Sequence, residues 1–226
     1  MTGIISAMGI ELEIILSKMT HVTSETLSGI KFYKGKLSEK DTVCAVCGIG
    51  KVNAAMCTQT MILKYSPKLV INTGIAGSIT STLGVFDIVL AQAVIQYDMD
   101  TTAFGDPIGY INNLGISYIP CSDKHNSLVE KTAQNLGITI KTGIVATGDK
   151  FVNSDTFSKE LHSQTNAIAC EMEGGAVGQV CRLNGVPFCI IRAISDKAGD
   201  DGALSYNAFI VKASKISSEL VLSYFL

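Results

Sequence analysis

Residues 167–196 read AIACEMEGGAVGQVCRLNGVPFCIIRAISD, with a helix candidate between two short apolar runs. The run at 167–170 is apolar throughout and the run at 187–194 is apolar apart from Arg192, which is typical of strands covered on both faces. The helix candidate between them spans residues 173–184. A strand, a helix and a second strand in this order predict a mostly parallel sheet flanked by helices.

The same alternation continues through the rest of the chain. Further strands are predicted at 3–7, 42–47, 69–72, 87–93 and 143–146, and further helices at 11–19, 52–64, 127–136, 155–163 and 206–225. No linker, low-complexity tract or internal repeat interrupts this pattern, so we expect residues 1–226 to form one α/β domain. Residues 99–120 are rich in Gly, Asn and Pro, and predict a long loop that is functional or contacts a neighbour.

The composition narrows the classes of function. Net charge is −2 and no run of Lys or Arg occurs, so the clustered positive charge that nucleic-acid binding needs is missing. A small uncharged or zwitterionic substrate fits this balance better. Hydrophobic residues make up 47% of the chain and charged residues 17%, which indicates either a well-filled core or a surface that partly faces another subunit.

The cysteines and the hydropathy pattern indicate a cytoplasmic protein. Most of the seven cysteines lie in apolar runs, as expected for small buried side chains in a reducing compartment. Cys44 and Cys47 form a CxxC without a second pair or a nearby His, so a zinc site is not expected, whereas a redox role stays open. No apolar run reaches 18 residues and no basic leader precedes the first strand, so neither membrane spanning nor secretion is expected.

Six predicted strands deliver glycine, a carboxylate or both to one edge of the sheet. Because ligands of open α/β sheets bind beyond the carboxyl ends of the strands, this edge is the expected site. The segments that follow the strands are 8–11, 48–51, 73–78, 147–151, 171–175 and 195–196. The glycines alone indicate only tight turns, since 48–53 has Asn53 where a dinucleotide fingerprint needs a third glycine.

Three carboxylates at this edge carry more information. Glu11, Glu173 and Asp196 all follow apolar strands. A charge in such a place is unfavourable unless it has a partner of opposite charge or serves in binding or catalysis. Glu11 could simply be a first-turn acid that favours the helix dipole, and Arg192 could pair with Glu173 or Asp196. Three carboxylates at one edge favour a functional role over these structural ones.

Motifs along the chain point to a family. They are GIISAM at 3–8 followed by Glu11, GIGKVNAA at 48–55, NTGIAG at 72–77, TTAFG at 101–105, GDKF at 148–151, EME at 171–173 and RAISD at 192–196. In this order the series resembles the bacterial methylthioadenosine/S-adenosylhomocysteine nucleosidases of the nucleoside phosphorylase superfamily. The resemblance implies a mixed, mostly parallel twisted sheet flanked by helices, no metal or organic cofactor, and hydrolysis of an adenine nucleoside, with 5′-deoxyadenosine as a further candidate substrate.

The resemblance also implies roles for the polar residues. Asp196 would protonate adenine N7 as the glycosidic bond breaks, which requires a raised pKa. Glu11 would orient and deprotonate the attacking water, as in inverting glycosidases. Glu173 would accept hydrogen bonds from the ribose hydroxyls with Met172 under the sugar, and Arg192 would hold Glu173 or the water.

The remaining implied residues bind the substrate. Phe151 would stack on adenine, and the backbone of Phe151 and Val152 would form hydrogen bonds with the edge of the adenine ring. Met8, Ile49 and Tyr206 would line the pocket for the sugar and the alkylthio tail. Phe104 would come from the partner subunit of a homodimer. The set of expected binding residues is completed by Ile75, Gly77 and Ser195.

Four positions depart from the family pattern. Ile75 stands where Ser is common, so Ser195 or Ser78 would have to position Asp196 instead. Gly9 and Ile10 replace acidic residues, and Asp98 stands where His is frequent. These departures bear on substrate preference and rate more than on reaction class.

Other functions remain as alternatives. A phosphorolytic nucleoside phosphorylase would need cations for phosphate, whereas segment 7–11 offers Glu11 and no Arg. A futalosine or aminofutalosine hydrolase is compatible with the same residues. A non-catalytic nucleoside-binding protein would be expected to lack Glu11 or Asp196, and both are present.

Overall fold

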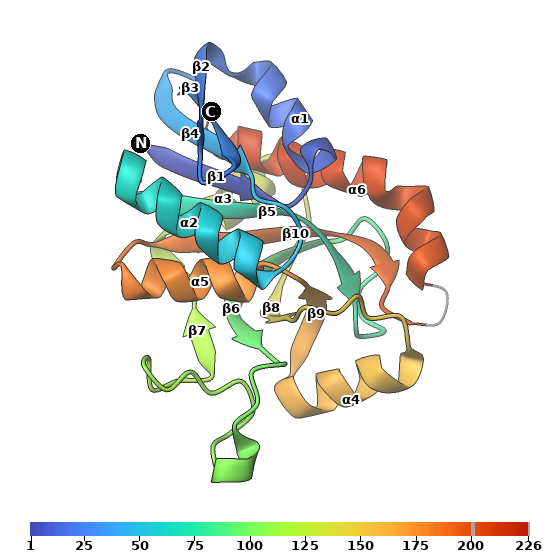
Figure 1. The fold of residues 1–226 in the computed structure, drawn as a ribbon. Helices are drawn as coiled ribbons and strands as arrows, with labels where there is room; N and C mark the ends of the chain where they lie inside the picture. Colours follow the sequence, from blue (N-terminus) through green and yellow to red (C-terminus); the bar gives the residue numbers. More distant parts are fainter. Residues whose placement is uncertain (200–201, 226) are drawn as a thin grey trace.

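The computed structural model describes residues 1–199 and 202–225, which form one mixed sheet flanked by helices (Figure 1). The strands in these residues are β1 (Thr2–Ser6), β2 (Thr20–Leu27), β3 (Ile30–Leu37), β4 (Lys40–Val46), β5 (Leu69–Ser78), β6 (Ile88–Gln96), β7 (Tyr118–Pro120), β8 (Ile140–Thr147), β9 (Ala167–Glu171) and β10 (Phe188–Lys197). The helices are α1 (Gly9–Lys18), α2 (Lys51–Tyr65), the short 3₁₀ helix η1 (Thr102–Phe104), α3 (Asp123–Asn135), α4 (Asp155–Thr165), α5 (Gly174–Leu183) and α6 (Gly202–Tyr224).

The sheet combines an open wing with a closed end. Its strand order is β10-β6-β8-β9-β5-β1-β4-β3-β2, with β7 beside β6. Because β10 also pairs in parallel with β5, the strands β10, β6, β8, β9 and β5 close on themselves. The parallel strands β1, β4, β5 and β10 therefore point their carboxyl ends toward one region of the molecule.

Helices cover both faces of the sheet. Helices α2 and α5 pack against each other on one face, and α1 and α6 pack together on the other, as Figure 1 shows. Alternate residues of β1 face the two layers: Ile5 belongs to the core cluster on the α2 and α5 side, and Ile4 to the cluster that contains Leu12 and Leu220. Both side chains are fully buried. None of the helices in the described residues is long and apolar enough to cross a membrane.

The predicted fold class is confirmed, and each predicted helix and strand occurs with shifted ends. Strands β5 and β10 extend beyond their predicted ends, to Ser78 and Lys197, because the two strands pair along nearly their whole length. Asp196 therefore lies inside a strand, at a bulge that follows Ile194.

The hairpin of β2 and β3 and the short strand β7 were not predicted. Nearly every residue of β2 is exposed, so its sequence THVTSETL lacks the apolar alternation that signals a half-buried strand. The expected long loop is present between β6 and β7, where η1 and an isolated bridge between Ile111 and Ile116 are its only regular elements among the described residues.

Candidate active site

A cavity of about 110 Å³ lies where the carboxyl ends of the strands meet. Its lining includes most of the residues expected from the sequence: Met8, Glu11, Ile49, Ile75, Gly77, Phe151, Met172, Glu173, Ser195, Asp196 and Tyr206. Ala7, Ala76, Cys170 and Glu171 complete the lining. The rule that sites lie beyond strand ends therefore located this set, although its members come from segments far apart in the chain.

A smaller cavity of about 30 Å³ adjoins the first. Asp196 and Phe151 line both cavities, whereas Glu11 lines only the larger one. Val152, expected beside the base, lines only the smaller cavity. The paired cavities thus offer one compartment beside Asp196 and another beside Glu11.

Glu11 is held from two sides in the first turn of α1. Its Oε2 accepts a hydrogen bond from the Met8 backbone N–H at 2.8 Å, and its Oε1 accepts one from Ile75 N–H at 3.1 Å. The side chain is 3% exposed, and burial raises its pKa. Glycine at 74 makes this possible, since a Cβ at that position would clash with Glu11 Oε1. The carboxylate caps α1 and also faces the cavity, so its structural role leaves it accessible to a ligand.

Asp196 has a different environment. Only 2% of the residue is exposed, and its Oδ1 accepts a hydrogen bond from the Ser195 hydroxyl at 2.6 Å. Burial raises the pKa of this carboxyl, while the bond from Ser195 opposes the shift. Of the two hydroxyls considered as substitutes at Ile75, Ser195 contacts Asp196, whereas Ser78 donates to the Thr80 carbonyl.

A buried ion-pair network supports Glu173. Its Oε1 accepts a hydrogen bond from Gly50 N–H at 2.9 Å, and its Oε2 lies 3.7 Å from Arg192 Nη2. Burial, followed by the neighbouring Glu171 carboxylate, raises the pKa of Glu173 to about 7. At neutral pH this group therefore stands close to its titration point.

Arg192 binds Glu171 more closely than Glu173. Its Nη2 forms a short ion pair with Glu171 and donates to Asn72 Oδ1 at 2.6 Å. Burial alone would lower the pKa of Arg192, but the carboxylates of Glu171, Glu173 and Glu11 outweigh it and raise the pKa. The guanidinium is 1% exposed and lies outside the lining of both cavities. Its expected contact with Glu173 is thus the longer of two, and Glu171 is its main partner.

Glu171 is the important residue that sequence analysis missed. Besides pairing with Arg192, its Oε2 accepts hydrogen bonds from Glu173 N–H at 3.0 Å and Gly174 N–H at 2.7 Å. The Thr147 hydroxyl also donates to it. A signal was available, because an arginine inside an apolar strand requires a buried partner, and EME offers two.

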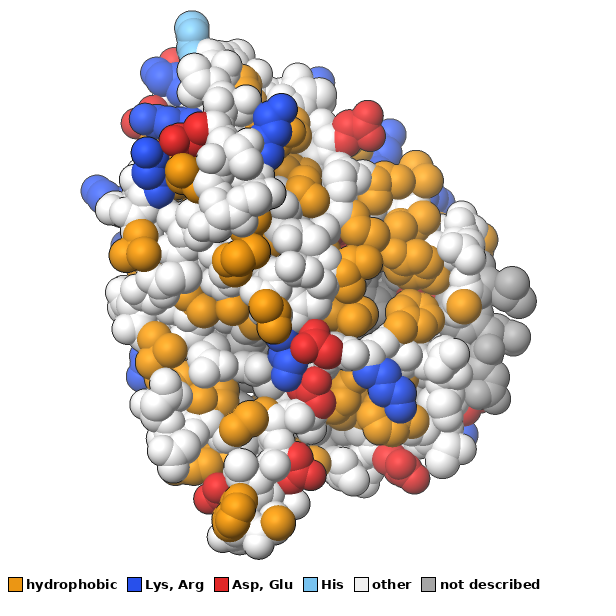
Figure 2. Space-filling view, in the orientation of Figure 1, with side chains coloured by type: hydrophobic (Ala, Val, Ile, Leu, Met, Phe, Trp, Pro, Cys, Tyr) orange, Lys and Arg blue, Asp and Glu red, His pale blue; other side chains and the backbone are white. Residues whose placement is uncertain are grey.

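Aromatic and sulfur side chains form one wall of the cavity. The rings of Phe151 and Tyr206 meet edge to face, with centroids 5.6 Å apart. The Tyr206 hydroxyl donates to Met8 Sδ at 3.3 Å. Ile49 and Phe151 remain about half exposed, and Figure 2 shows hydrophobic side chains gathered around a hollow on this face. The mouth of the cavity is therefore apolar.

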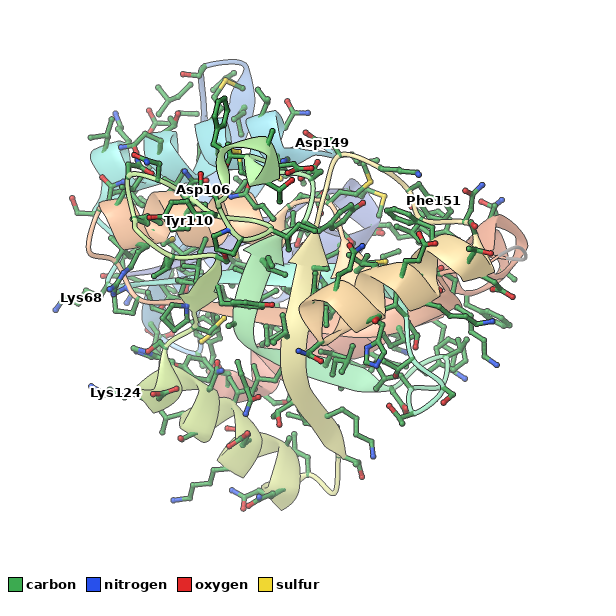
Figure 3. The ribbon with its side chains drawn as sticks, turned by 90° about the horizontal axis from the view of Figure 1, so that it is seen from below. Lys68, Asp106, Tyr110, Lys124, Asp149 and Phe151 are labelled. Carbon is green, nitrogen blue, oxygen red and sulfur yellow. The ribbon has the colours of Figure 1, made fainter. Side chains whose placement is uncertain are left out.

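Three loops beside this mouth are tied together. Lys51 Nζ lies 2.6 Å from Asp98 Oδ1, and Lys51 N–H donates to Asp149 Oδ1 at 2.7 Å. Asp149 N–H in turn donates to Asp98 Oδ2 at 2.9 Å. Asp149 and Phe151 lie on the segment between β8 and α4, where Figure 3 labels both. The network thus holds the segment that carries Phe151, and it gives Asp98 a structural partner.

Phe104 lies outside both cavities of its own chain. It belongs to η1 in the long loop, and it is 87% exposed. Such exposure is unfavourable for a phenylalanine unless another surface covers it. Cys44 and Cys47 are both buried free thiols, directed toward Met19 Sδ and the Gly48 carbonyl respectively.

Comparisons with known proteins agree on one family. The chain matches the phosphorylase superfamily over residues 2–225. A 5′-methylthioadenosine/S-adenosylhomocysteine nucleosidase of Shewanella sp. (strain W3-18-1) is 39% identical over 221 residues, which cover 97% of this chain and 96% of the relative.

Two solved structures from Helicobacter pylori superpose closely. One is a 5′-methylthioadenosine/S-adenosylhomocysteine nucleosidase in complex with a substituted pyrrolidin-3-ol. It has a TM-score of 0.95 and is 35% identical, and the match covers 99% of this chain and 96% of that one. The other is described as a futalosine hydrolase, with a TM-score of 0.96, 35% identity and the same coverage.

Proposed function

The chain belongs to the phosphorylase superfamily, and we propose that it hydrolyses the N-glycosidic bond of 5′-methylthioadenosine and S-adenosylhomocysteine, releasing adenine and the thioribose product. Residues 1–226 act as one nucleosidase domain in this proposal. The observation that carries it is the pair of buried carboxyl groups, Glu11 and Asp196, in one cavity with different environments.

Asp196 is the general acid in this mechanism. The adenine base lies against Phe151 and beside Asp196, two residues that line both cavities. A carboxyl that stays protonated because it is buried can donate a proton to adenine N7 as the C–N bond breaks. Protonation makes the base a neutral leaving group, and the backbone near Val152 supplies polar contacts for its edge.

Glu11 activates the water on the other side of the sugar. Two backbone N–H groups fix its carboxylate, so its lone pairs are directed before substrate binds. It takes a proton from the water as the oxygen attacks the ribosyl cation, which is the arrangement of an inverting glycosidase. Glu173 accepts hydrogen bonds from the ribose hydroxyls, with Met172 beside it.

The charge of the cavity favours hydrolysis over phosphorolysis. Three buried carboxyl groups, those of Glu11, Glu171 and Glu173, surround one guanidinium, that of Arg192. The carboxylate form of Glu11 beside the sugar stabilises an oxocarbenium-like ribosyl cation and repels a phosphate dianion. Arg192 is engaged by Glu171 and Asn72, so it is not free to bind phosphate.

Hydrolysis of aminofutalosine is a second candidate function. The likeness to the Helicobacter pylori futalosine hydrolase favours it. Both reactions break a bond between ribose and a purine, and both use the same acid and water. The apolar, half-open mouth beside Ile49 and Phe151 accommodates 5′ substituents of different sizes.

We further propose that the protein is a cytoplasmic homodimer. Exposed hydrophobic side chains gather on α2, the segment before it, α5 and η1, as expected for a subunit interface: Ile49, Val52, Met56, Leu63, Leu183 and Phe104. In the dimer, Phe104 of one subunit closes the tail end of the other subunit's cavity. Seven free, buried thiols suit a reducing compartment.

The test is adenine release from 5′-methylthioadenosine in phosphate-free buffer, repeated with phosphate added. We expect release without phosphate, with free methylthioribose as the sugar product. Release that requires phosphate and yields a sugar phosphate would contradict the role of Glu11. Parallel assays with S-adenosylhomocysteine and aminofutalosine rank the substrates by kcat/KM.

A further inference from the structure

Phe86 has a strained backbone in the turn between β5 and β6. Its φ is +77°, in the left-handed region that glycine favours. Among the described non-glycine residues with positive φ, Phe86 alone has a hydrophobic side chain. Strain of this kind persists only where the surrounding structure imposes it, and it marks positions where conformation serves a role.

Hydrogen bonds fix this turn against β10. Phe86 N–H donates to the Ile194 carbonyl at 2.8 Å, and Ile194 N–H donates to the Asp87 carbonyl at 2.9 Å. The Asp87 carboxylate accepts a further bond from Gly84 N–H at 2.8 Å. The turn is therefore anchored directly before Ser195 and Asp196, which line the cavity.

The ring of Phe86 is directed at α6. It meets Phe209 edge to face, with ring centroids 5.3 Å apart and an interplanar angle of 83°. Lys212 Nζ lies 4.1 Å from the ring centroid, in a cation–π contact. The strained backbone thus places one aromatic ring against two side chains of a single helical turn.

The same ring belongs to a hydrophobic cluster that reaches the cavity. Phe86 packs with Ile75, Ala213 and Tyr206 in this cluster. Ile75 and Tyr206 both line the cavity, and Tyr206 contacts Phe151 and Met8 there. Phe86 is therefore one layer behind the wall that the nucleoside touches.

We propose that Phe86 is a positioning residue that holds the first turns of α6, and through them Tyr206, against the substrate cavity. The proposal rests on the nucleosidase function proposed above. Glu11 and Asp196 are held by other contacts, on α1 and β10, so the chemical step does not depend on the clamp. The clamp acts on substrate binding, and its loss raises KM while kcat is retained.

The primary test is Phe86→Gly. Glycine relieves the left-handed strain and removes the ring, so the turn stays intact while the clamp is lost. Because one aromatic contact is worth about 0.5–1.5 kcal/mol, we expect KM for 5′-methylthioadenosine to rise roughly twofold to twelvefold at nearly constant kcat. Hydrogen exchange of the backbone amides 206–212 should become faster.

Two further variants complete the test. Phe209→Ala removes the other half of the ring pair without touching the strained turn, and it should reproduce the rise in KM and the faster exchange. Val211→Ala is the matched control, because Val211 lies on the same turn of α6 and is 64% exposed. It should leave KM, kcat and exchange unchanged.

An ordinary packing role would give a different result. A lower melting temperature for Phe86→Gly, with KM and the exchange of 206–212 both unchanged, would overturn the proposal. The exchange experiment needs no substrate. A wild-type protein that fails to hydrolyse 5′-methylthioadenosine would therefore refute the proposed function while the clamp is still tested by exchange.

Discussion

The Asp196 carboxyl can act as an acid because the fold keeps it out of water. It is 2% exposed, and burial raises its pKa although the Ser195 hydroxyl bonds to the carboxylate. A raised pKa means that the protonated form persists to higher pH than in an exposed aspartate. In the proposed mechanism only that form protonates the leaving adenine, so kcat/KM should fall as pH rises through the pKa of Asp196.

Replacing Asp196 by asparagine tests this assignment. The asparagine side chain would keep the shape and could still donate a hydrogen bond to the base, but it has no proton to transfer. For Asp196→Asn we expect adenine release to fall by about 10²–10⁴-fold, because that is the usual contribution of a general acid. Binding of 5′-methylthioadenosine, measured by calorimetry, should be retained. The residual activity should also lose the fall at alkaline pH.

A control substitution separates the role of Asp196 from effects of charge alone. Asp41→Asn removes one carboxylate from an exposed position on β4 and should leave activity unchanged. Full turnover by Asp196→Asn would show that another group protonates the base.

At the scale of residues, the sequence predicted the groups that end strands and missed those that support them. Glu11, Glu173 and Asp196 could be recognised because each follows an apolar run, and the sheet brings such ends together. Asp98, Lys51 and Asp149 form their network across 47 to 98 positions of sequence. No local sequence pattern indicates contacts over such separations, so this loop network could be found only in the structure.

At the scale of elements, Glu171 joins four parts of the fold. It ends β9, pairs with Arg192 on β10, accepts the Thr147 hydroxyl of β8 and binds the first N–H groups around α5. The N–H of Gly174 at the start of α5 is therefore satisfied by a carboxylate, which also favours the helix dipole. The site depends on this junction, because Glu173 lies within it.

Glu171→Gln should destabilise the whole junction. The amide keeps the volume but leaves Arg192 without its main counter-charge and turns one acceptor into a donor. Breaking a buried pair in this way costs about 3–5 kcal/mol, which corresponds to a fall of roughly 6–20 °C in melting temperature for a chain of this size. Differential scanning calorimetry measures the change.

Glu160→Gln on α4 is the matched control for Glu171→Gln. Glu160 is exposed, so its substitution should change stability by no more than about 0.5 kcal/mol. If both variants have the same melting temperature as the wild type, Glu171 does not hold the junction.

The elements that the sequence failed to predict share one property. Strands β1, β4, β5 and β10 are buried, and their continuous apolar runs made them visible. Strand β2 is exposed along almost its whole length, and it is held by pairing with β3 and by contacts of Glu25 with Tyr65 and Lys64 on α2. Ser28 and Gly29, both with positive φ, form the turn between β2 and β3. The Ser-Gly pair is a weak signal for a hairpin, and the flanking residues lack the alternation of apolar and polar side chains that would support it.

At the scale of the whole molecule, the sequence predicted the layers but not how the sheet closes. The sheet closes because β10 pairs with β6 along one edge and with β5 along the other. This pairing depends on how distant strands meet in space, which no local sequence pattern indicates. Closure brings the ends of β5, β9 and β10 around one cavity. It also leaves α2 and α5 as an outer layer with exposed apolar side chains.

The proposed homodimer predicts that a charge on this outer layer separates the subunits. Val52 is 77% exposed on α2 and lies beside a cavity between α2 and α5. In an interface, Val52→Glu would bury an unpaired carboxylate, and the cost would oppose association. We expect wild type to sediment as a dimer and Val52→Glu as a monomer. The monomer should show a raised KM, since Phe104 of the partner no longer closes the cavity.

The matched control for Val52→Glu is Val211→Glu, at an exposed position on α6, which should remain dimeric with its KM unchanged. A wild type that sediments as a monomer would refute the dimer, and a dimeric Val52→Glu would place the interface elsewhere.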